Sequence, residues 1–255
     1  MKIATWNVNS IRARLPRVLA WLERAKPDVA CIQETKVEDE AFPRAEILAA
    51  GYRAAIFGQK TYNGVALLSR EEPADVVRGL PGDGPEDQKR LIAATFGGVR
   101  IVNVYVPNGE STDSDKFSFK LRWLEKLRDF LATGCNVSKP LVLCGDFNIA
   151  PEDRDVHDPE KWRDQVLCHP KERAALAEIC NVGLKDAQRL LSQEGKLYTW
   201  WDYRGGAFPR GFGLRIDLHL VSRPLEPKVE AVEIDVTERK GAQPSDHAPV
   251  ILRLR

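Results

Sequence analysis

An apolar run that ends in an acid and an amide lies at residues 141–148: Leu141-Val142-Leu143-Cys144-Gly145-Asp146-Phe147-Asn148. Four apolar residues closed by a glycine predict a buried β-strand. Asp146 and Asn148 then follow where a loop leaves a rigid sheet, and binding and catalytic groups are often placed at such points. Taken alone, an Asp-x-Asn sequence is more typical of an ordinary turn.

Polar residues sit beside apolar runs at four further places. They are Asn7 with Asn9, Glu34, Asp217, and the pair Asp246 and His247, which precedes the last run. Each alone is typical of a strand end or a turn. Five such sites in one chain argue against this interpretation for all of them. Carboxylates gathered at one edge repel one another, so several together need a cation, or one of them must hold a proton.

The residues at these strand ends point to one kind of chemistry. Oxygen ligands without clusters of cysteine or histidine fit Mg²⁺, which keeps several waters and often shares a phosphate. A metal ion, a general base and amide donors together suit the attack of water on a phosphate ester. Asp217 and His247 can form a pair in which the carboxylate orients the imidazole and favours its positive form, which then faces a phosphate oxygen.

A segment rich in aromatic residues and arginines spans residues 198–215. Its members are Tyr198, Trp200, Trp201, Tyr203, Arg204, Phe208, Arg210, Phe212 and Arg215. Aromatic side chains stack on unpaired bases or wedge a duplex, and arginines bind phosphates. Strand alternation over 214–220 buries one face, so Arg215, Asp217 and His219 are expected to point the other way. The alternative is a core strand followed by a solvated loop; as a cluster, the segment favours nucleic acid.

Length, composition and charge exclude several classes of protein. The chain has 255 residues, 43% hydrophobic and 29% charged, which excludes a disordered chain. Surface scaling for this length predicts a folded accessible area of roughly 11,000 Å² and a large core. No apolar run approaches the roughly 18 residues of a transmembrane helix, so no membrane partner is expected, and the polar N-terminus predicts no signal peptide. Because the net charge is only +1, any binding of nucleic acid must come from a local basic patch.

The five cysteines favour a cytosolic protein. Their number is odd and no two have the C-x-x-C spacing. We therefore expect reduced thiols, mostly in the core, and no zinc site.

Short strand-like runs alternate with a few helices along the chain. The expected strands are 3–8, 29–32, 52–57, 64–68, 91–96, 100–106, 141–144, 198–203, 214–221, 229–236 and 249–254. Gly97-Gly98 predicts a hairpin turn. We expect one helix from Pro16, one over 114–132 and one from Pro170 to just before Gly183. Many strands with interspersed helices suggest two sheets packed face to face with helices outside.

The chain resembles exodeoxyribonuclease III and its relatives, the bacterial AP endonucleases of the endonuclease/exonuclease/phosphatase superfamily. The motifs that carry the resemblance are Trp6-Asn7-Val8-Asn9, Gln33-Glu34-Thr35-Lys36, Gly58-Gln59-Lys60, 64–68, 105–109, 145–150, 200–204, 213–217 and Ser245-Asp246-His247-Ala248-Pro249. The resemblance implies one domain over residues 1–255. It implies a DNase I-like fold, a four-layer α/β sandwich with two packed mixed β-sheets flanked by helices.

The resemblance also implies an activity, the Mg²⁺-dependent hydrolysis of DNA phosphodiesters to leave a 3′-hydroxyl, with Mn²⁺ able to substitute. The family acts as AP endonuclease, 3′–5′ exonuclease and 3′-phosphatase or 3′-phosphodiesterase. The expected substrate is double-stranded DNA with abasic sites, nicks or blocked 3′ ends, bound by a monomer in the cytoplasm, at the nucleoid of a bacterial-type cell. One alternative is a family member that binds nucleic acid as a regulator without cutting it, which would lack Glu34, Asp146 or His247. Another is a superfamily member that acts on lipid or inositol phosphates, against which the aromatic segment argues.

The resemblance assigns roles to the residues at the strand ends. The metal ligands it implies are Glu34, Asn7 and Asp246. The catalytic residues it implies are Asp146, His247, Asp217, Tyr105 and Asn148. In this assignment Asp146 orients and deprotonates the attacking water, held by Asn148. His247, paired with Asp217, contacts the non-bridging phosphate oxygen, and Tyr105 adds a donor.

The substrate contacts that the resemblance implies are Asn108, Arg90, Trp200, Arg204, Leu214, Ile216 and Leu167. Trp200, Leu214 and Ile216 would line the pocket for a flipped-out sugar. The chain departs from the family at two positions. Ser10 stands where the motif usually has glycine, and Leu167 stands where the AP endonucleases place glycine or serine beside the DNA backbone. A branched side chain at 167 narrows this pocket, which predicts that internal abasic-site cleavage is weakened relative to 3′-end processing.

Overall fold

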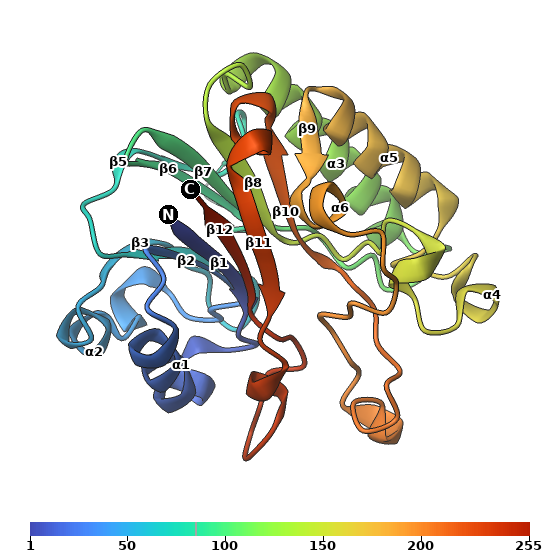
Figure 1. Cartoon of the computed structure of the whole chain (residues 1–255), viewed down its shortest axis with the longest axis horizontal. Coiled ribbons are helices and arrows are strands. Elements are labelled where there is room, and N and C mark those ends of the chain that lie inside the picture. Colours follow the sequence, from blue (N-terminus) through green and yellow to red (C-terminus); the bar gives the residue numbers. More distant parts are fainter. Residues whose placement is uncertain (85) are drawn as a thin grey trace.

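Two six-stranded β-sheets form the centre of the protein and pack face to face between two layers of helices (Figure 1). The computed structural model describes residues 1–84 and 86–255. The strand order in the first sheet is β11 (Val229–Ile234), β12 (Val250–Leu254), β1 (Lys2–Asn7), β2 (Val29–Gln33), β4 (Val65–Ser69), β3 (Arg53–Phe57). In the second sheet it is β5 (Ala74–Arg78), β6 (Leu91–Phe96), β7 (Val99–Tyr105), β8 (Leu141–Asp146), β10 (Asp217–Ser222), β9 (Leu184–Asp186). Both sheets are mixed. In the first, β1 is parallel to β2 and antiparallel to β12. In the second, β8 is parallel to β7 and antiparallel to β10.

The inward faces of the two sheets form an apolar core. Ile3, Val29 and Val65 of the first sheet belong to the same buried cluster as Ile92 and Val142 of the second. Strands β2 and β8 are buried along their whole length. A strand covered on both faces needs apolar side chains at successive positions, which explains the unbroken apolar runs in the sequence.

Polar bonds also cross this core and join the two sheets. The Nε2 of Gln33 in β2 donates to Oδ1 of Asn103 in β7 over 2.7 Å. The Nδ2 of Asn103 donates in turn to the carbonyls of Ile32 and Ala66 in the first sheet, both over 3.0 Å. Because buried polar groups need partners, these bonds are satisfied in one relative position of the sheets.

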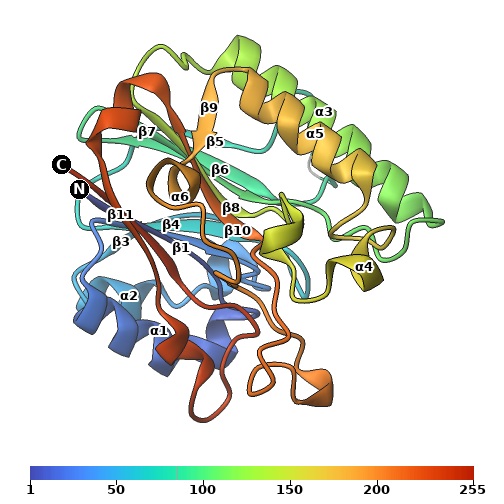
Figure 2. The ribbon, with the colours of Figure 1, turned by 45° about the vertical axis from the view of Figure 1, so that its right-hand side comes forward.

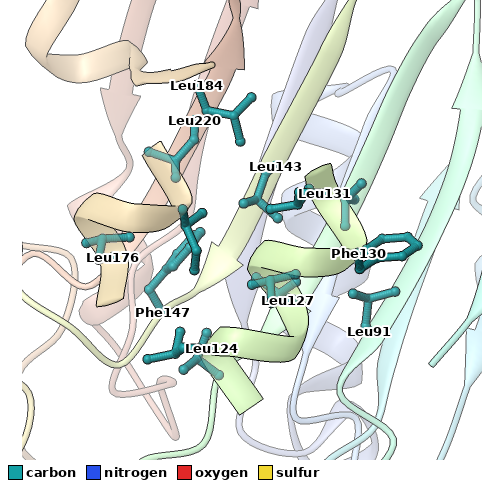
Figure 3. Close-up of a cluster of buried hydrophobic side chains, with 14 of the residues drawn as sticks. Leu91, Leu124, Leu127, Phe130, Leu131, Leu143, Phe147, Leu176, Leu184 and Leu220 are labelled. Atoms are coloured by element: carbon teal, nitrogen blue, oxygen red, sulfur yellow. The ribbon is translucent and has the colours of Figure 1, made fainter. Parts of the chain in front are cut away.

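Helices cover the outer face of each sheet. The first sheet is covered by α1 (Ile11–Ala25) and α2 (Arg44–Ala49), which bury Trp21 and Ile47 completely. The second is covered by α3 (Asp115–Gly134) and α5 (Pro170–Asn181), whose Leu127 and Leu176 pack with Phe147 and other apolar side chains (Figure 3). The predicted four-layer sandwich is confirmed, and the accessible surface of 11458 Å² agrees with the size scaling.

Several predicted boundaries agree with the structure. Ser114 caps α3 by accepting the backbone N–H of Phe117 over 3.2 Å. Helix α5 begins at Pro170, as expected, behind a capping box made by His169 and Glu172. The predicted hairpin joins β6 to β7, and both residues of its Gly97-Gly98 turn have a positive φ.

Two expectations about elements are wrong. Helix α1 begins at Ile11 rather than at Pro16, because Ser10 supplies the cap by accepting the N–H of Ala13 over 3.4 Å. Residues 198–203 form no strand: isolated bridges join Trp200 to residues 214 and 247, and the chain then leaves the sheet as a loop that includes the 3₁₀ helix Arg204–Gly206.

The sequence does not predict β5, β9, α2 or the two short helices α4 (Pro159–Trp162) and α6 (Ala187–Leu191). Strand β5 is largely exposed, and its polar sequence reads as a loop. Further short 3₁₀ helices span Asp39–Ala41, Asp153–Asp155, Arg223–Lys228 and Val236–Arg239. Over the described residues, no helix is long and apolar enough to cross a membrane.

The strand directions bring the polar strand ends to one edge of the sandwich. In the parallel pairs, Asn7 lies beside Gln33, and Tyr105 beside Asp146. The antiparallel neighbour β10 begins at Asp217, directly opposite Asp146. The loops 200–213 and 235–247 project from this edge, whereas the two chain ends lie at the opposite edge (Figures 1 and 2).

Candidate active site

Asp146, at the end of β8, lies at the centre of the polar cluster and is 1% exposed. One carboxylate oxygen accepts the Nδ2–H of Asn7 over 2.9 Å, and the other accepts the backbone N–H of Asn148 over 2.8 Å. The Nδ2 of Asn148 also lies 3.3 Å from the first oxygen. Asn148 holds its backbone in the left-handed region, with φ 49°, which turns its N–H toward the carboxylate.

The surroundings of Asp146 make it a base suited to neutral pH. Burial, together with the charge of Asp217, raises its pKa to about 7, against the opposing effects of His247 and of the hydrogen bonds from Asn7 and Asn148. A carboxylate with a pKa near the working pH is an effective proton acceptor for water.

His247 and Asp217 form the predicted carboxylate–imidazole pair. Nδ1 of His247 lies 2.9 and 3.1 Å from the two carboxylate oxygens of Asp217, and Nε2 lies 3.6 Å from Oδ2 of Asp146. The hydroxyl of Thr199 accepts the backbone N–H of Asp217 over 3.1 Å, which fixes the start of β10. Burial alone would lower the pKa of His247, but the carboxylates of Asp217 and Asp146 raise it to about 10. The ring is therefore an imidazolium at neutral pH.

Asn7 and Glu34 lie on the other side of Asp146. Nδ2 of Asn7 donates to Glu34 Oε1 over 2.8 Å, so one amide group bridges the carboxylates of Glu34 and Asp146. Glu34 also has a left-handed backbone, with φ 52°, directly after β2. Its second oxygen pairs with Nζ of Lys36 at 2.8 Å.

Asp246 reaches this group through two side chains that the sequence did not single out for a role. Oδ1 of Asp246 accepts from Asn9 Nδ2 over 3.1 Å, and the Oδ1 of Asn9 accepts from Lys36 Nζ over 2.6 Å. Oδ2 of Asp246 accepts the indole N–H of Trp200 over 3.0 Å. Burial opposes ionisation, but His247 and these hydrogen bonds hold the pKa of Asp246 below its usual value.

The donor set of the cluster fits a hard divalent cation. Ligand atoms of Asp146, Asp217 and His247 all lie within 4.8 Å of one another, and the carboxylate of Glu34 is joined to Asp146 through the Nδ2 of Asn7. The Oδ1 of Asn7 accepts the backbone N–H of Asn9 over 3.0 Å. Carboxylate and amide oxygens without thiolates are the ligands that suit Mg²⁺ or Mn²⁺. The amide hydrogens of Asn7 now occupy the position between two carboxylates where a cation is favoured.

Tyr105 ends β7 near Glu34, and Arg90, which directly precedes β6, lies beside Tyr105. The guanidinium of Arg90 lies 4.5 Å from the centre of the Tyr105 ring, and its Nη1 donates to the Tyr105 carbonyl over 3.1 Å. Burial, with the charge of Glu34, raises the pKa of Tyr105, so its hydroxyl keeps its proton. Arg90 is 9% exposed and supports Tyr105 from behind; its DNA contact stays a prediction. Asn108 is exposed, and its Nδ2 donates to Oδ1 of Asn148 over 3.1 Å.

The predicted pocket residues lie together next to the cluster. Leu167, Leu214 and Ile216 are fully buried in one apolar group, against which Trp200 packs partly buried. Leu167 has φ 80°, a conformation that favours glycine, and its side chain is held in the group. Its carbonyl accepts the N–H of Ala150 over 2.7 Å, which joins this wall to the loop after β8.

Two predicted arginines lie outside the cluster. The side chain of Arg204 is 92% exposed on the projecting loop and pairs with Asp202. The face that carries Arg215, Asp217 and His219 is covered rather than open, so Arg215 does not face the proposed DNA side. Its guanidinium is buried between Asp155, at 2.7 Å, and Asp186, also at 2.7 Å, because the segment before β10 bridges residues around 156 and 200 and is covered on both sides.

Two further buried cations support the site and were not singled out from the sequence. Lys120 in α3 lies beneath the loops of Asn108 and Asn148. Arg239 lies 5.1 to 5.8 Å from the ring centres of Phe208, Tyr203 and Trp201 and so anchors the projecting loop. Lys120 had a sequence signal, a lysine at a position where the helical period of α3 requires an apolar side chain.

Comparison with known proteins agrees with this geometry. The sequence profile of the endonuclease/exonuclease/phosphatase family matches residues 4–247. The chain belongs to this family. Within the endonuclease/exonuclease/phosphatase family, it is 37% identical to exodeoxyribonuclease III of Haemophilus influenzae over 262 aligned residues, which cover 98% of each chain.

Two solved structures of family members superpose on nearly the whole chain. One is the 3′ phosphatase NExo from Neisseria bound to a product DNA hairpin, with 45% identity and a TM-score of 0.97 over 100% of this chain and 99% of that one. The other is an AP endonuclease from Archaeoglobus fulgidus, with 42% identity and a TM-score of 0.95 over the same shares. The likeness therefore extends to the projecting loops as well as to the sandwich.

Proposed function

We propose that this protein is a metal-dependent DNA-repair nuclease that hydrolyses phosphate esters of DNA, as AP endonuclease, 3′–5′ exonuclease and 3′-phosphatase or 3′-phosphodiesterase. The observation that carries the proposal is the imidazolium of His247 held between Asp217 and Asp146, beside Asn7 and Glu34. The full-length likeness to a DNA-bound 3′ phosphatase and to an AP endonuclease supports DNA as the substrate. The complete carboxylate set argues against a silent regulator.

Asp146 acts as the base for the attacking water. Its pKa of about 7 lets it take a proton at neutral pH, and the backbone N–H of Asn148 keeps one oxygen in place while the other accepts the proton. The Nδ2 of Asn148 is itself fixed by the carbonyl of Val106 at 3.0 Å, so the base has a defined orientation before substrate binds.

His247 stabilises the phosphate as negative charge builds up on it. Its Nδ1 is engaged by Asp217, which leaves the Nε2–H free to donate to a non-bridging oxygen of the phosphate. A preorganised donor of this kind contributes about 10²–10³ in rate. The hydroxyl of Tyr105 and the amide of Asn108 add donors on the other side of the phosphate.

Glu34 and Asn7 would hold the metal ion, and Asp246, which is linked to Glu34 through Asn9 and Lys36, would assist or serve a second position. The ion we propose is Mg²⁺, with Mn²⁺ as a substitute, because every ligand atom is oxygen. When bound, it neutralises charge on the phosphate and the leaving oxygen. Lys36 and the Asn7 amide balance the carboxylates when the ion is absent.

Leu167 favours 3′-end processing over the cleavage of internal abasic sites. Its side chain is 4% exposed and packs in one apolar group with Leu214 and Ile216, where an extruded sugar would bind. A nucleotide inside a strand is held at both ends, so it must enter the space that Leu167 narrows. A terminal 3′-phosphate or nucleotide is held at one end only and has more freedom to fit.

The proposed substrate is double-stranded DNA with nicks, blocked 3′ ends or abasic sites. Acting on chromosomal DNA puts the enzyme in the cytoplasm of a bacterial cell, at the nucleoid. A monomer is sufficient, because every side chain assigned to the chemistry comes from one chain.

Two labelled duplexes test the proposal, one with an internal abasic-site analogue and one with a 3′-phosphate at a nick, each with Mg²⁺ and with EDTA. We expect the 3′-phosphate to be removed in the presence of Mg²⁺ and to remain in the presence of EDTA. The abasic site is expected to be cut more slowly than the 3′-phosphate is removed. Asp146→Asn, which keeps the shape and removes the base, is the matched control. Duplexes that are bound and never cut would refute the nuclease and leave a DNA-binding protein.

A further inference from the structure

A fully buried ion pair joins α3 to α5 behind the proposed active site. Lys120 and Glu172 are both 0% exposed, and Nζ of Lys120 contacts the carboxylate of Glu172. The same Nζ donates to the carbonyl of Asn148 over 2.7 Å and to that of Asn108 over 3.1 Å. An ammonium has three N–H donors, so this group is completely satisfied by three acceptors from three segments of the chain.

Both carbonyls belong to residues whose side chains face the reaction. The Nδ2 of Asn108 donates to the Oδ1 of Asn148 over 3.1 Å, and the N–H of Asn148 donates to Asp146 over 2.8 Å. Lys120 therefore binds the carbonyl of Asn148, the same residue whose backbone N–H holds Asp146. A shift of this backbone would move the Asn148 amide and Asp146 together.

Glu172 connects the pair to the loop that carries Leu167. Its second carboxylate oxygen accepts the N–H of His169 over 3.1 Å at the start of α5. The carbonyl of Leu167 accepts the N–H of Ala150 over 2.7 Å, and Nε of Arg173 donates to the carbonyl of Ala150 over 3.0 Å. The loop after β8 is thus bonded on one side to Lys120 and on the other to the beginning of α5.

We infer that Lys120 is a positioning residue for the reaction: by binding the carbonyls of Asn108 and Asn148, it sets where these two side chains meet the substrate and Asp146. Glu172 is the counter-ion that makes a cation tolerable at this depth. The inference rests on the roles proposed above for Asn148 and Asp146.

Stability alone is a poor explanation for this pair. Removing two charges from water costs about as much as their attraction returns, so apolar side chains of the same shape often serve a protein as well. Position 120 also falls on the apolar stripe of α3, between Phe117 and Leu124, where an apolar residue would complete the packing. What a cation provides, and an apolar side chain does not, is a fixed point for two carbonyls.

The test is the double variant Lys120→Met/Glu172→Gln, which removes both charges and keeps the volume. We expect kcat on the 3′-phosphate duplex to fall about 10²-fold with KM changed less than about threefold, because a misplaced group costs the chemical step rather than binding. Glu172→Gln alone leaves the buried ammonium without its counter-ion, so it serves as a test of stability and not as a control for activity.

Two controls separate positioning from lost stability and from the proposed function. Ile47→Ala in α2, in the helical layer on the far side of the first sheet, lowers stability and is expected to leave kcat unchanged. Asn148→Ala tests the proposed site itself. An unchanged kcat in the double variant overturns the inference if Asn148→Ala is slow, whereas fast turnover by Asn148→Ala refutes the site assignment. If the double variant does not fold, Lys120→Gln replaces it, and parental kcat in that variant overturns the inference equally.

Discussion

The side chain of Leu167 is buried in the apolar group of the proposed pocket, and its replacement by glycine is expected to have two opposing effects on stability. Removing a buried leucine side chain costs about 2–5 kcal/mol, since the surrounding group collapses only partly. Releasing the left-handed backbone at φ 80° returns about 1–2 kcal/mol. We therefore expect Leu167→Gly to lose at most about 4 kcal/mol of the free energy of unfolding, and its melting temperature to fall by at most about 16 °C.

The effect of Leu167→Gly on specificity follows from what the side chain blocks. Pushing a packed side chain aside to admit a sugar costs about 1–3 kcal/mol, which is a factor of about 5–150 in rate. We expect kcat/KM for internal abasic-site cleavage to rise about 5- to 150-fold in the variant. Removal of a 3′-phosphate at a nick is expected to change by less than about threefold.

The assay compares single-turnover cleavage of the two labelled duplexes at 25 °C, below the melting temperature of both proteins. Leu131→Ala, a buried leucine of the α3 layer far from the pocket, is the control for lost stability and should leave the ratio of the two rates unchanged. An unchanged ratio in Leu167→Gly would show that the side chain does not obstruct the abasic sugar, and the reasoning about the wall would be wrong.

Three further predictions concern the charged groups. Asp146→Ala should lower kcat at least about 10²-fold in steady-state assays, and near-normal turnover would remove Asp146 from the role of base. The raised pKa of His247, about 10, keeps turnover high through neutral pH and lets it fall as the imidazolium loses its proton; Asp217→Asn removes a carboxylate that raises this pKa, so its pH–rate profile should decline at lower pH. A decline at the parental pH would contradict the pairing. Mg²⁺ should raise the melting temperature, and more at pH 8 than at pH 6, because Asp146, with a pKa of about 7, holds a proton at the lower pH; no rise at saturating Mg²⁺ would contradict the metal site.

The sequence predicted the sandwich and the edge where the polar residues meet, because burial on both faces leaves a signature in each central strand. The run that ends at Asp146 is apolar at its first four positions, which a strand between two layers requires. Strand β5 escaped prediction for the opposite reason, since it lies at an exposed edge and its composition is that of a loop.

The burial of the face that carries Arg215 could not be read from the sequence. Alternation assumes one buried and one open face, but the segment that carries Arg215 is covered on both, and buried aspartates neutralise the guanidinium. Lys120 was missed because a lone lysine in an amphipathic helix is ordinarily a solvated residue, and its acceptors lie on segments distant in the chain. Its place on the apolar stripe of α3 is a local signal of burial, but its distant partners leave no such signal.

The hydrogen bonds that cross between the sheets have a consequence for how this protein tolerates mutation. Asn7 and Glu34 belong to the first sheet, while Asp146 and Asp217 belong to the second, so each sheet carries only half of the site. A shear of one sheet over the other would leave both halves folded and their chemistry out of alignment. Changes at Gln33 or in the layer between the sheets therefore act on turnover from a distance, and engineering for robustness should begin in the two helical layers.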